Sequence, residues 1–273
     1  MSAVTFVLKA DLRQRLDVSP LIPASLAGMD LGRIAALVLQ YGNRRLPVGE
    51  LFDLELSSAG PDLTFRGGSD KFDYVGRGMT AGEIFVEGCA GAYLGLQMKG
   101  GRIRVAGDVG IFCAAEMRGG QILVSGDAGD WLGAALPGNR KGMAGGAVVV
   151  GGGAGARAGD HMRRGVLLIE GDAGDYLGAR MVAGTIAVKG CVGSHPGYAM
   201  KRGTLLLFSP PASLPPTFND CGAHTLGFLP LLVKSFASLG SAAFGASAAG
   251  VGRVRRYAGD LAVSGKGEIL IVL

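Results

Sequence analysis

Histidine and cysteine, the side chains most often used as bases, nucleophiles and metal ligands, are few and scattered in this chain. They are Cys89, Cys113, Cys191 and Cys221, with His161, His195 and His224. Because no CxxC pair occurs and the histidines are only three, neither a zinc cage nor an iron–sulfur site is expected within the chain. No paired-carboxylate or nucleophile-elbow motif is present either. We therefore expect no catalytic residues and no bound metal, and we interpret the histidines as structural or partner-facing.

Charged residues, in contrast, recur at fixed places. Methionines at positions 79, 98, 117, 143, 162, 181 and 200 are separated by 19 residues, except for one interval of 26. Ten of the 27 basic residues lie within three positions of these methionines: Arg77, Lys99, Arg118, Arg140, Lys141, Arg163, Arg164, Arg180, Lys201 and Arg202. Acidic residues come eight to thirteen positions after them: Glu87, Asp108, Asp127, Asp130, Glu170, Asp172 and Asp175. If equivalent positions stack, the molecule has a basic edge and an acidic edge.

The basic edge is the candidate binding site. Its proposed members are Arg140, Lys141, Arg163, Arg164, Lys201 and Arg202. A row of cations suits an acidic partner or a polyanionic ligand. Since each exposed contact contributes only about 0–1 kcal/mol, several must act together. The alternative is that these residues form an ordinary solvated corner.

The repeat itself predicts the fold. Each methionine is followed by a glycine three residues later and by aliphatic residues five and seven residues later, as in Gly120, Ile122 and Val124. Aliphatic positions two apart share one face of a strand, and the segments between glycines are too short for helices. Short strands joined by glycine corners are typical of a β-helix coil. We predict an all-β core, a right-handed parallel β-helix with about seven 19-residue coils.

Two glycine-rich patterns suggest ligand chemistry when taken alone. Residues 148–156 look like a flavin or nicotinamide fingerprint, but their glycines are in phase with the other repeats and no adequate helix follows. Residues 126–130 and 171–175 look like calcium-binding glycine–aspartate repeats, which need a nine-residue period. The period here is 19, and other residues replace the aspartate in several repeats. We interpret these aspartates as caps of the backbone at corners.

The flanking segments lack the repeat and are predicted to be small α/β elements. We expect three parts: an N-terminal segment at residues 1–59, the β-helix at 60–208 and a C-terminal segment at 209–273. The first should contain a helix over residues 31–40, with Asp30 near its start, and a strand over 51–56. The last should contain a helix over 226–239 and a final strand over 267–273, which must pair with another strand.

Composition excludes several classes of protein. Glycine makes up 49 of 273 residues without a three-residue period, which excludes collagen, and 48% hydrophobic residues exclude wholesale disorder. The net charge is +5, and the sequence has no run of five residues of like charge, so nucleic-acid binding is not expected. The longest uncharged stretch, residues 235–252, is too weakly hydrophobic for a membrane span. No secretory signal is expected, and unclustered cysteines suit the reduced thiols of a soluble cytoplasmic protein.

Three further stretches carry a family resemblance, and with the repeat they span nearly the whole chain. They are the long loop at 136–146, the chain end at 256–262 with 265–268, and the opening at 26–29 with 49–52. The repeat resembles the β-helical domain of glutamate synthase. The combination more closely resembles the C subunit of formylmethanofuran dehydrogenase, whose bacterial relative belongs to the formyltransferase/hydrolase complex of methylotrophs.

The resemblance implies a four-subunit assembly in one-carbon metabolism (formaldehyde oxidation). Such an assembly moves a formyl group from tetrahydromethanopterin to a methanofuran-type carrier and then releases formate. The chemistry would reside in a formyltransferase subunit and a metal-dependent amidohydrolase-like subunit, so this chain would be a scaffold without an active site, cofactor or metal. Because such carriers have oligoglutamate tails, the basic edge is expected to bind the tail or a partner. Two alternatives stay open: the same subunit in an archaeal-type tungsten or molybdenum dehydrogenase, and a stand-alone β-helix enzyme.

Overall fold

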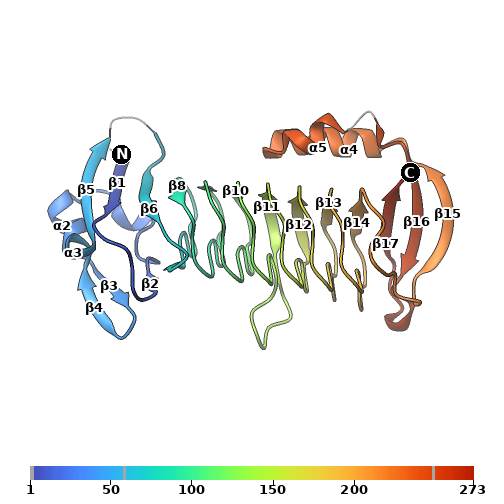
Figure 1. The fold of residues 1–273 in the computed structure, drawn as a ribbon, viewed down its shortest axis with the longest axis horizontal. Coiled ribbons are helices and arrows are strands. Elements are labelled where there is room, and N and C mark those ends of the chain that lie inside the picture. Colours follow the sequence, from blue (N-terminus) through green and yellow to red (C-terminus); the bar gives the residue numbers. More distant parts are fainter. Residues whose placement is uncertain (1–2, 58–59, 248–249) are drawn as a thin grey trace.

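The computed structural model describes residues 3–57, 60–247 and 250–273, and the molecule is elongated along one long sheet (Figure 1). Most of the described chain that has regular structure is β. In the order in which they lie side by side, the strands of this sheet are β15 (Asn219–Thr225), β16 (Arg253–Gly259), β17 (Gly267–Val272), β14 (Thr204–Leu207), β13 (Thr185–Val188), β12 (Arg164–Ile169), β11 (Ala144–Val150), β10 (Gln121–Val124), β9 (Arg102–Val105), β8 (Glu83–Gly88), β6 (Leu63–Gly68), β1 (Ala3–Leu8) and β5 (Phe52–Ser57).

Strands β8 to β14 come one from each repeat and pair in parallel with their neighbours. Ile103 of β9 lies beside Ile122 of β10, which is its equivalent one repeat later. A second parallel ladder of single bridges links Ala90, Val109, Ala128, Ala154, Ala173 and Val192 in turn. The methionines and the aliphatic residues five and seven positions after them are at most 3% exposed. Successive windings of the chain therefore stack along the long axis and enclose a continuous apolar core (Figure 1).

Aspartates at one corner join several of the repeats to the next one. Asp127 Oδ1 accepts a hydrogen bond from the Gly153 N–H at 2.7 Å, and Asp172 Oδ1 accepts one from the Cys191 N–H at 2.7 Å. Glycine is required at position 152 because a Cβ there would overlap the Asp127 carboxylate. The interpretation of the corner aspartates as backbone caps is confirmed.

Rings stack along the next corner. The aromatic column consists of Tyr74, Tyr93, Phe112, Trp131, Arg157, Tyr176 and His195, all with φ between 57° and 65°. Tyr74 and Tyr93 stack with centroids 4.9 Å apart and planes 7° apart. The Arg157 guanidinium continues the stack, 5.0 Å from the Trp131 centroid and 4.7 Å from that of Tyr176. A planar cation can replace an aromatic ring in the column because it packs on both neighbouring faces.

The N-terminal part extends the long sheet and adds a second one. That sheet contains β4 (Arg44–Pro47), β3 (Val38–Tyr41), β2 (Leu16–Asp17) and β7 (Phe72–Asp73), and the helices here are α1 (Pro23–Leu26), α2 (Leu31–Ala35) and α3 (Val48–Leu51). β1 pairs in parallel with β6 and antiparallel with β5, which forms one edge of the long sheet. Phe6, Phe52, Phe65 and Phe72 form a fully buried cluster between the two sheets.

The helix predicted over residues 31–40 is wrong in its second half. Asp30 does cap α2 by accepting the Arg33 N–H at 2.8 Å, but the helix ends at Ala35 and residues 38–41 form β3. A two-residue turn at Gly42 and Asn43 folds β4 back onto β3, and this hairpin pairing competes with further helix. The strand predicted over residues 51–56 is β5.

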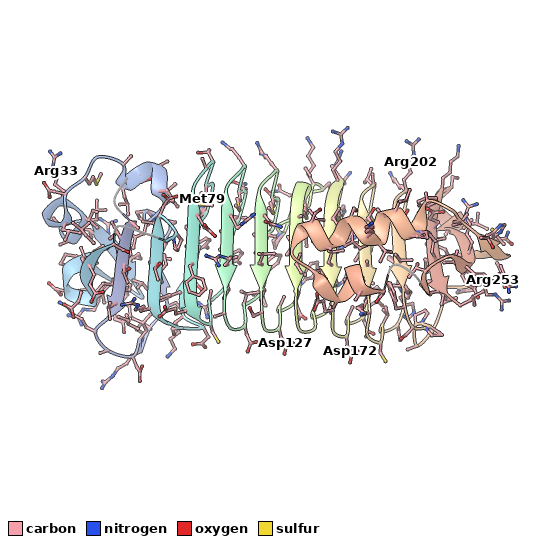
Figure 2. The ribbon with its side chains drawn as sticks, turned by 90° about the horizontal axis from the view of Figure 1, so that it is seen from above. Arg33, Met79, Asp127, Asp172, Arg202 and Arg253 are labelled. Carbon is pink, nitrogen blue, oxygen red and sulfur yellow. The ribbon has the colours of Figure 1, made fainter. Side chains whose placement is uncertain are left out.

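The C-terminal part closes the sheet and covers one face of it. α4 (Leu229–Phe236) and α5 (Ala242–Ala246) lie over β11 to β14 (Figures 1 and 2). Under them lie the outward-facing side chains Val149, Leu168, Ala187 and Leu206. The final predicted strand is β17, which pairs in parallel with β14 and antiparallel with β16. None of the helices in the described residues has the length and apolar character that a membrane span requires.

Candidate functional site

Backbone hydrogen bonds position the basic edge, which we define as Arg140, Lys141, Arg163, Arg164, Lys201 and Arg202. The N–H of Arg163 donates to the carbonyl of Met143 at 2.8 Å, and the N–H of Lys201 donates to that of Met181 at 2.8 Å. Each bond reaches back one repeat, from the residue directly after a buried methionine. The second basic residue of each pair begins β12 or lies just before β14. The backbone hydrogen bonds between repeats therefore fix the Cα positions from which the side chains of Arg163 and Lys201 extend.

The structure gathers the basic edge around two adjoining hollows. The first, of about 680 Å³, is lined by Ala144, Arg163, Arg164, Val182, Ala183, Lys201 and Arg202. The second, of about 620 Å³, is lined by Glu116, Arg118, Gly138, Asn139, Arg140, Lys141, Gly142 and Ala144. Ala144 belongs to both walls, so all six predicted residues surround one continuous region of the surface.

Arg163 is the most enclosed member of the basic edge. Its Nη2 donates to the carbonyl oxygen of Arg140 at 3.4 Å, and its buried Nε has no hydrogen-bond partner in the described part of the chain. The other five members are exposed. Among residues 3–57, 60–247 and 250–273, no carboxylate oxygen lies within 4.0 Å of a basic-edge nitrogen. An anionic group would therefore meet cations that no carboxylate pairs within 4.0 Å, and a donor that lacks an acceptor.

Glu116 anchors the loop of residues 136–142, which carries two members of the basic edge. Asn139 Nδ2 donates to Glu116 Oε1 at 2.5 Å, and Gln97 Nε2 donates to Oε2 at 2.9 Å. Burial acts to raise the pKa of Glu116, but these hydrogen bonds, one from the loop backbone and a nearby guanidinium hold the pKa below its ordinary value. Glu116 is thus ionised at neutral pH and holds the loop beside the second hollow.

Two cations predicted for this corner lie elsewhere. Arg77 packs over the Tyr74 ring at 5.3 Å. Arg180 binds the carboxylate of Asp160 through both Nε and Nη2. Arg180, directly before Met181, faces the aromatic column, since it shares a cavity wall with Trp131. Distance from the methionine in the sequence therefore does not tell a residue of the basic edge from one that faces the aromatic column.

The acidic corner lies on the opposite side of the molecule. In Figure 2, Arg202 points to one side of the sheet, while Asp127 and Asp172 point to the other. The two glutamates predicted for this edge have partners within the chain: Glu87 pairs with Arg66 at 3.5 Å, and Glu170 accepts from Ser241. The basic residue Arg202 and the acidic residues Asp127 and Asp172 therefore lie on opposite sides of the stacked repeats, as the repeat predicts.

The described histidines and cysteines do not gather at one site, although His224 lies beside Cys221. His195 stacks on Tyr176 at 5.1 Å, and Nε2 of His224 lies 2.9 Å from the Cys221 carbonyl oxygen. Burial raises the pKa of the Cys113 thiol to about 12. Within the described residues, no three His, Cys, Asp or Glu side chains gather where they would hold a metal ion.

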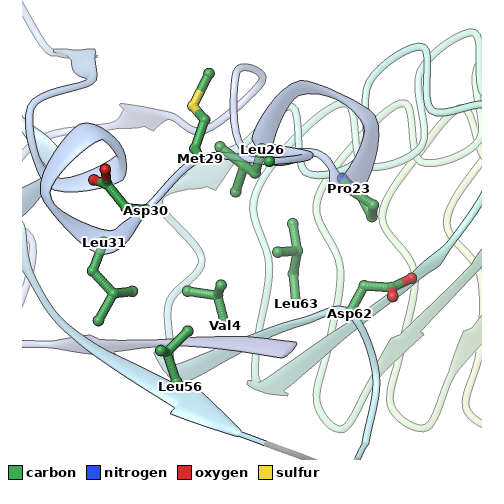
Figure 3. A pocket seen from close by; sticks show the side chains of 10 residues that line it. Val4, Pro23, Leu26, Met29, Asp30, Leu31, Leu56, Asp62 and Leu63 are labelled. Atoms are coloured by element: carbon green, nitrogen blue, oxygen red, sulfur yellow. The ribbon is translucent and has the colours of Figure 1, made fainter. Parts of the chain in front are cut away.

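A hollow of about 450 Å³ at the N-terminal end is mostly aliphatic (Figure 3). Leu26 and Met29 line one side, and Leu56 and Leu63 line the other. The two carboxylates on its wall have backbone partners: that of Asp30 caps α2, and that of Asp62 accepts the Glu83 N–H at 2.8 Å. These carboxylates therefore hold the local backbone in place.

Comparison with known proteins identifies the family. No family model matches the chain. A chain in the X-ray crystal structure of the formyltransferase/hydrolase complex (FhcABCD) from Methylorubrum extorquens, in complex with methylofuran, matches with a TM-score of 0.91 and 39% identity, over 98% of this chain and 99% of that chain. The C subunit of the tungsten-containing formylmethanofuran dehydrogenase 2 of Methanococcus maripaludis is 34% identical over 94 residues, and the C subunit of the Fhc complex of Methylorubrum extorquens is 39% identical over 87 residues. The chain belongs to this family of C subunits.

The two sequence matches to these C subunits are local. They cover 34% and 32% of this chain, and 35% and 32% of the relatives, so the aligned part spans about a third of these curated proteins. The stretches that carry the resemblance have definite places in the fold. The loop at 136–146 borders the second hollow, and residues 256–262 and 265–268 contribute to β16 and β17.

Sequence analysis missed one charged residue of this family member, Asp160. It is 1% exposed and is bound by His161 and Arg180. The equivalent position, three residues after the aromatic-column residue, holds Ala134 in the repeat before and Ala179 in the repeat after. An acidic residue between two alanines at this position is the signal that could have found it.

Proposed function

We propose that the chain is a non-catalytic scaffold subunit of a formyltransferase/hydrolase complex. This complex would convert formyl-tetrahydromethanopterin to formate through a formylated methanofuran-type carrier. The observation that carries the proposal is the match over 98% of this chain, with a TM-score of 0.91, to a chain of the FhcABCD complex. The proposed partners are a formyltransferase subunit, an amidohydrolase-like subunit that carries the metal, and a further subunit.

In this proposal the repeat is a right-handed parallel β-helix of about seven coils at residues 60–208, between the segments 1–59 and 209–273. The two parallel ladders, each with a spacing of one repeat, support this fold. A β-helix is stiff because each coil is hydrogen-bonded to both neighbours. Surface groups on it are held at fixed separations, which is what a scaffold requires.

The basic edge is proposed to hold the acidic tail of the carrier. The FhcABCD relative is a complex with methylofuran. The family resemblance implies that carriers of the methanofuran type have oligoglutamate tails. The pair Arg163 and Arg164 and the pair Lys201 and Arg202 are two windings apart, or about 10 Å at a strand spacing of ~4.8 Å. Cations at this interval, together with the unpaired Nε of Arg163, suit a chain of repeating carboxylates. Each exposed contact would contribute about 0–1 kcal/mol, so the tail must meet several.

The companions of the chain test the proposed assembly. The chain would be purified with a small affinity tag from its natural host at its natural expression level, and its companions identified by mass spectrometry. Recovery of formyltransferase and amidohydrolase-like subunits in amounts equal to this chain supports the assembly. Recovery of the chain without companions contradicts it.

Charge reversal tests the basic edge within the complex. Arg163, Arg164 and Lys201 would be changed together to Glu, and the retention of the carrier and of each partner measured at low salt. A matched control changes Arg33, Arg44 and Arg45, which are also exposed but lie at the N-terminal end, to Glu. Loss of the carrier from an intact complex, with the control unaffected, supports tail binding. If assembly fails first, the basic edge is an interface with a partner; if both survive, it is a solvated corner.

The archaeal-type dehydrogenase is the second candidate. The C subunit of the tungsten enzyme from Methanococcus maripaludis is 34% identical over 94 residues, and the C subunit of the molybdenum enzyme from Methanothermobacter wolfeii is 38% identical over 89 residues. The same purification distinguishes the two assemblies. Companions with iron–sulfur clusters and a tungsten or molybdenum site would favour the dehydrogenase.

A further inference from the structure

A cavity outside the basic edge lies between the loop of residues 136–142 and the aromatic column. It has a volume of about 390 Å³, within the range of small-molecule sites. Its main walls are Phe112, Trp131, Leu136, Pro137, His161 and Arg180. No member of the basic edge lines it, although Gly138 and Asn139 of the loop border both this cavity and the second hollow.

A buried charge cluster that the repeat does not require lies at the wall of this cavity. Asp160 is 1% exposed, and its carboxylate is bound by Arg180, by His161 Nδ1 at 2.7 Å and by Arg157 Nη1 at 3.6 Å. The repeats directly before and after place Ala134 and Ala179 at the same position, three residues after the aromatic-column residue, and both are fully buried. Because burying a carboxylate is costly and alanine satisfies the fold, stability alone does not explain this cluster.

The cluster leaves defined groups available to a ligand. Two guanidinium groups face one carboxylate, so the cluster has one positive charge in excess, and the Arg180 guanidinium, which binds Asp160 through Nε and Nη2, lies at the cavity wall. Burial lowers the pKa of His161, and the charge of Arg180 lowers it further, against the opposing effect of Asp160. A neutral His161 that donates from Nδ1 to Asp160 has Nε2 as an acceptor.

We propose that this cavity binds a small planar aromatic acid with a hydroxyl or amine donor on its ring. The carboxylate of the ligand pairs with Arg180, and the ring donor bonds to His161 Nε2. The ring packs against Leu136, Pro137 and the edges of Phe112 and Trp131. Those ring edges carry the positive side of the aromatic quadrupole, which favours an electron-rich ligand face.

Tryptophan fluorescence reads this site directly. Trp131 is the single tryptophan of the sequence and forms a wall of the cavity. The probe is 4-hydroxybenzoate, titrated into the full chain, with benzoate and 4-methylphenol as ligands that lack the donor or the acid. We expect 4-hydroxybenzoate to change the emission with saturation and to bind at least tenfold more tightly than either comparator. Equal binding of all three, or no saturable change, overturns the proposal.

Two variants and one control locate the binding. Arg180→Met removes the cation, and Ala135→Leu fills the cavity without altering any charge, because Ala135 lines it and is 7% exposed. Each should weaken 4-hydroxybenzoate binding at least tenfold, while Arg202→Met, with the same loss of charge on the basic edge, should leave it unchanged. Should Arg180→Met fail to fold, as judged by circular dichroism, Ala135→Leu decides. Unchanged binding in a folded Ala135→Leu variant refutes the site.

The assembled complex provides the last test. The same titration is made on the complex purified through this chain, with ligand-observed NMR because other subunits add tryptophans. Binding with the same order of ligands supports the proposal. Binding to the free chain but not to the complex means that a partner side chain fills the cavity, which overturns it. The outcome is independent of the basic edge, so its failure and that of the proposed function are distinguishable.

Discussion

Replacing Gly120 by alanine should destabilise the stacked repeats by more than its backbone conformation alone explains. Gly120 has φ +89°, and a Cβ there would lie 2.7 Å from the Gly101 carbonyl oxygen and 2.7 Å from Met98 Cε. The Gly101 carbonyl accepts the Gln121 N–H at 2.9 Å, so it cannot move away without weakening the ladder. The clash is therefore with backbone that is held in place.

Gly138 provides the matched control. Its φ is +85°, nearly the same as that of Gly120, but a Cβ there meets no atom within 4 Å. Both substitutions carry the cost of a left-handed alanine, about 1–3 kcal/mol. Only Gly120→Ala adds overpacking, which contributes about 1–3 kcal/mol more. Gly184→Ala should fall between them, because its nearest neighbour is the flexible Met162 Cε at 2.9 Å.

Thermal unfolding of the full chain, followed by far-ultraviolet circular dichroism, measures these differences. For a chain of this size, 1 kcal/mol shifts the midpoint by about 2–4 °C. Gly120→Ala should therefore unfold at least several degrees below Gly138→Ala. Equal midpoints for the two variants would refute the argument that close approach between windings limits residue 120 to glycine.

Three further predictions follow from single side chains. Since the pKa of Glu116 is lowered on folding, its hold on the loop should be complete above pH about 4.5 and lost as pH falls through the lower folded value, with faster hydrogen exchange at 136–142. Glu116→Ala, which removes both acceptor oxygens, should free the loop at neutral pH, and unchanged exchange would contradict this. Asp127→Ala should lower the free energy of unfolding by about 1 kcal/mol, because the hydrogen bond to Gly153 of the next repeat is lost. Asp127→Asn keeps an acceptor oxygen and should lower it by less. Equal losses of stability in the two variants would contradict this capping role. Native Cys113, buried and with a raised pKa, should resist a thiol reagent at pH 8 that modifies exposed Cys191, and equal rates would show that the core opens.

The register of the repeat could be predicted from sequence because one buried residue type recurs at one place. With methionine as the reference, the positions of the inward aliphatic residues follow from the alternation of a strand. The structure places Ile122 beside Val148 across the 26-residue interval, because the insertion is confined to a loop outside the ladder. The positions of the basic-edge residues were predicted by the same count from each methionine.

Features that depend on contacts between distant segments could not be predicted in this way. The C-terminal helices cover the sheet because Leu168 and Leu206 are apolar on the outward side, between inward neighbours that are apolar as well. Strands apolar on both faces indicate a sheet buried on both faces, a signal that was present but unused. Asp160 interrupts a row of alanines, but its partners Arg157 and Arg180 are identified only by the way the windings stack.

Because equivalent residues of successive repeats pair in register, the length of the stack changes by one strand spacing for each repeat that is added or removed. Neighbouring strands are about 4.8 Å apart, so excision of residues 99–117 would shorten the stack by about 4.8 Å. β8 would then meet β10, whose inward residues are the equivalents of those it now contacts in β9. The parallel ladder ends in antiparallel pairs on both sides, with β5 and β15 as the edge strands. Evolution can therefore adjust the distance between the two ends one winding at a time, in discrete increments, without rebuilding either end.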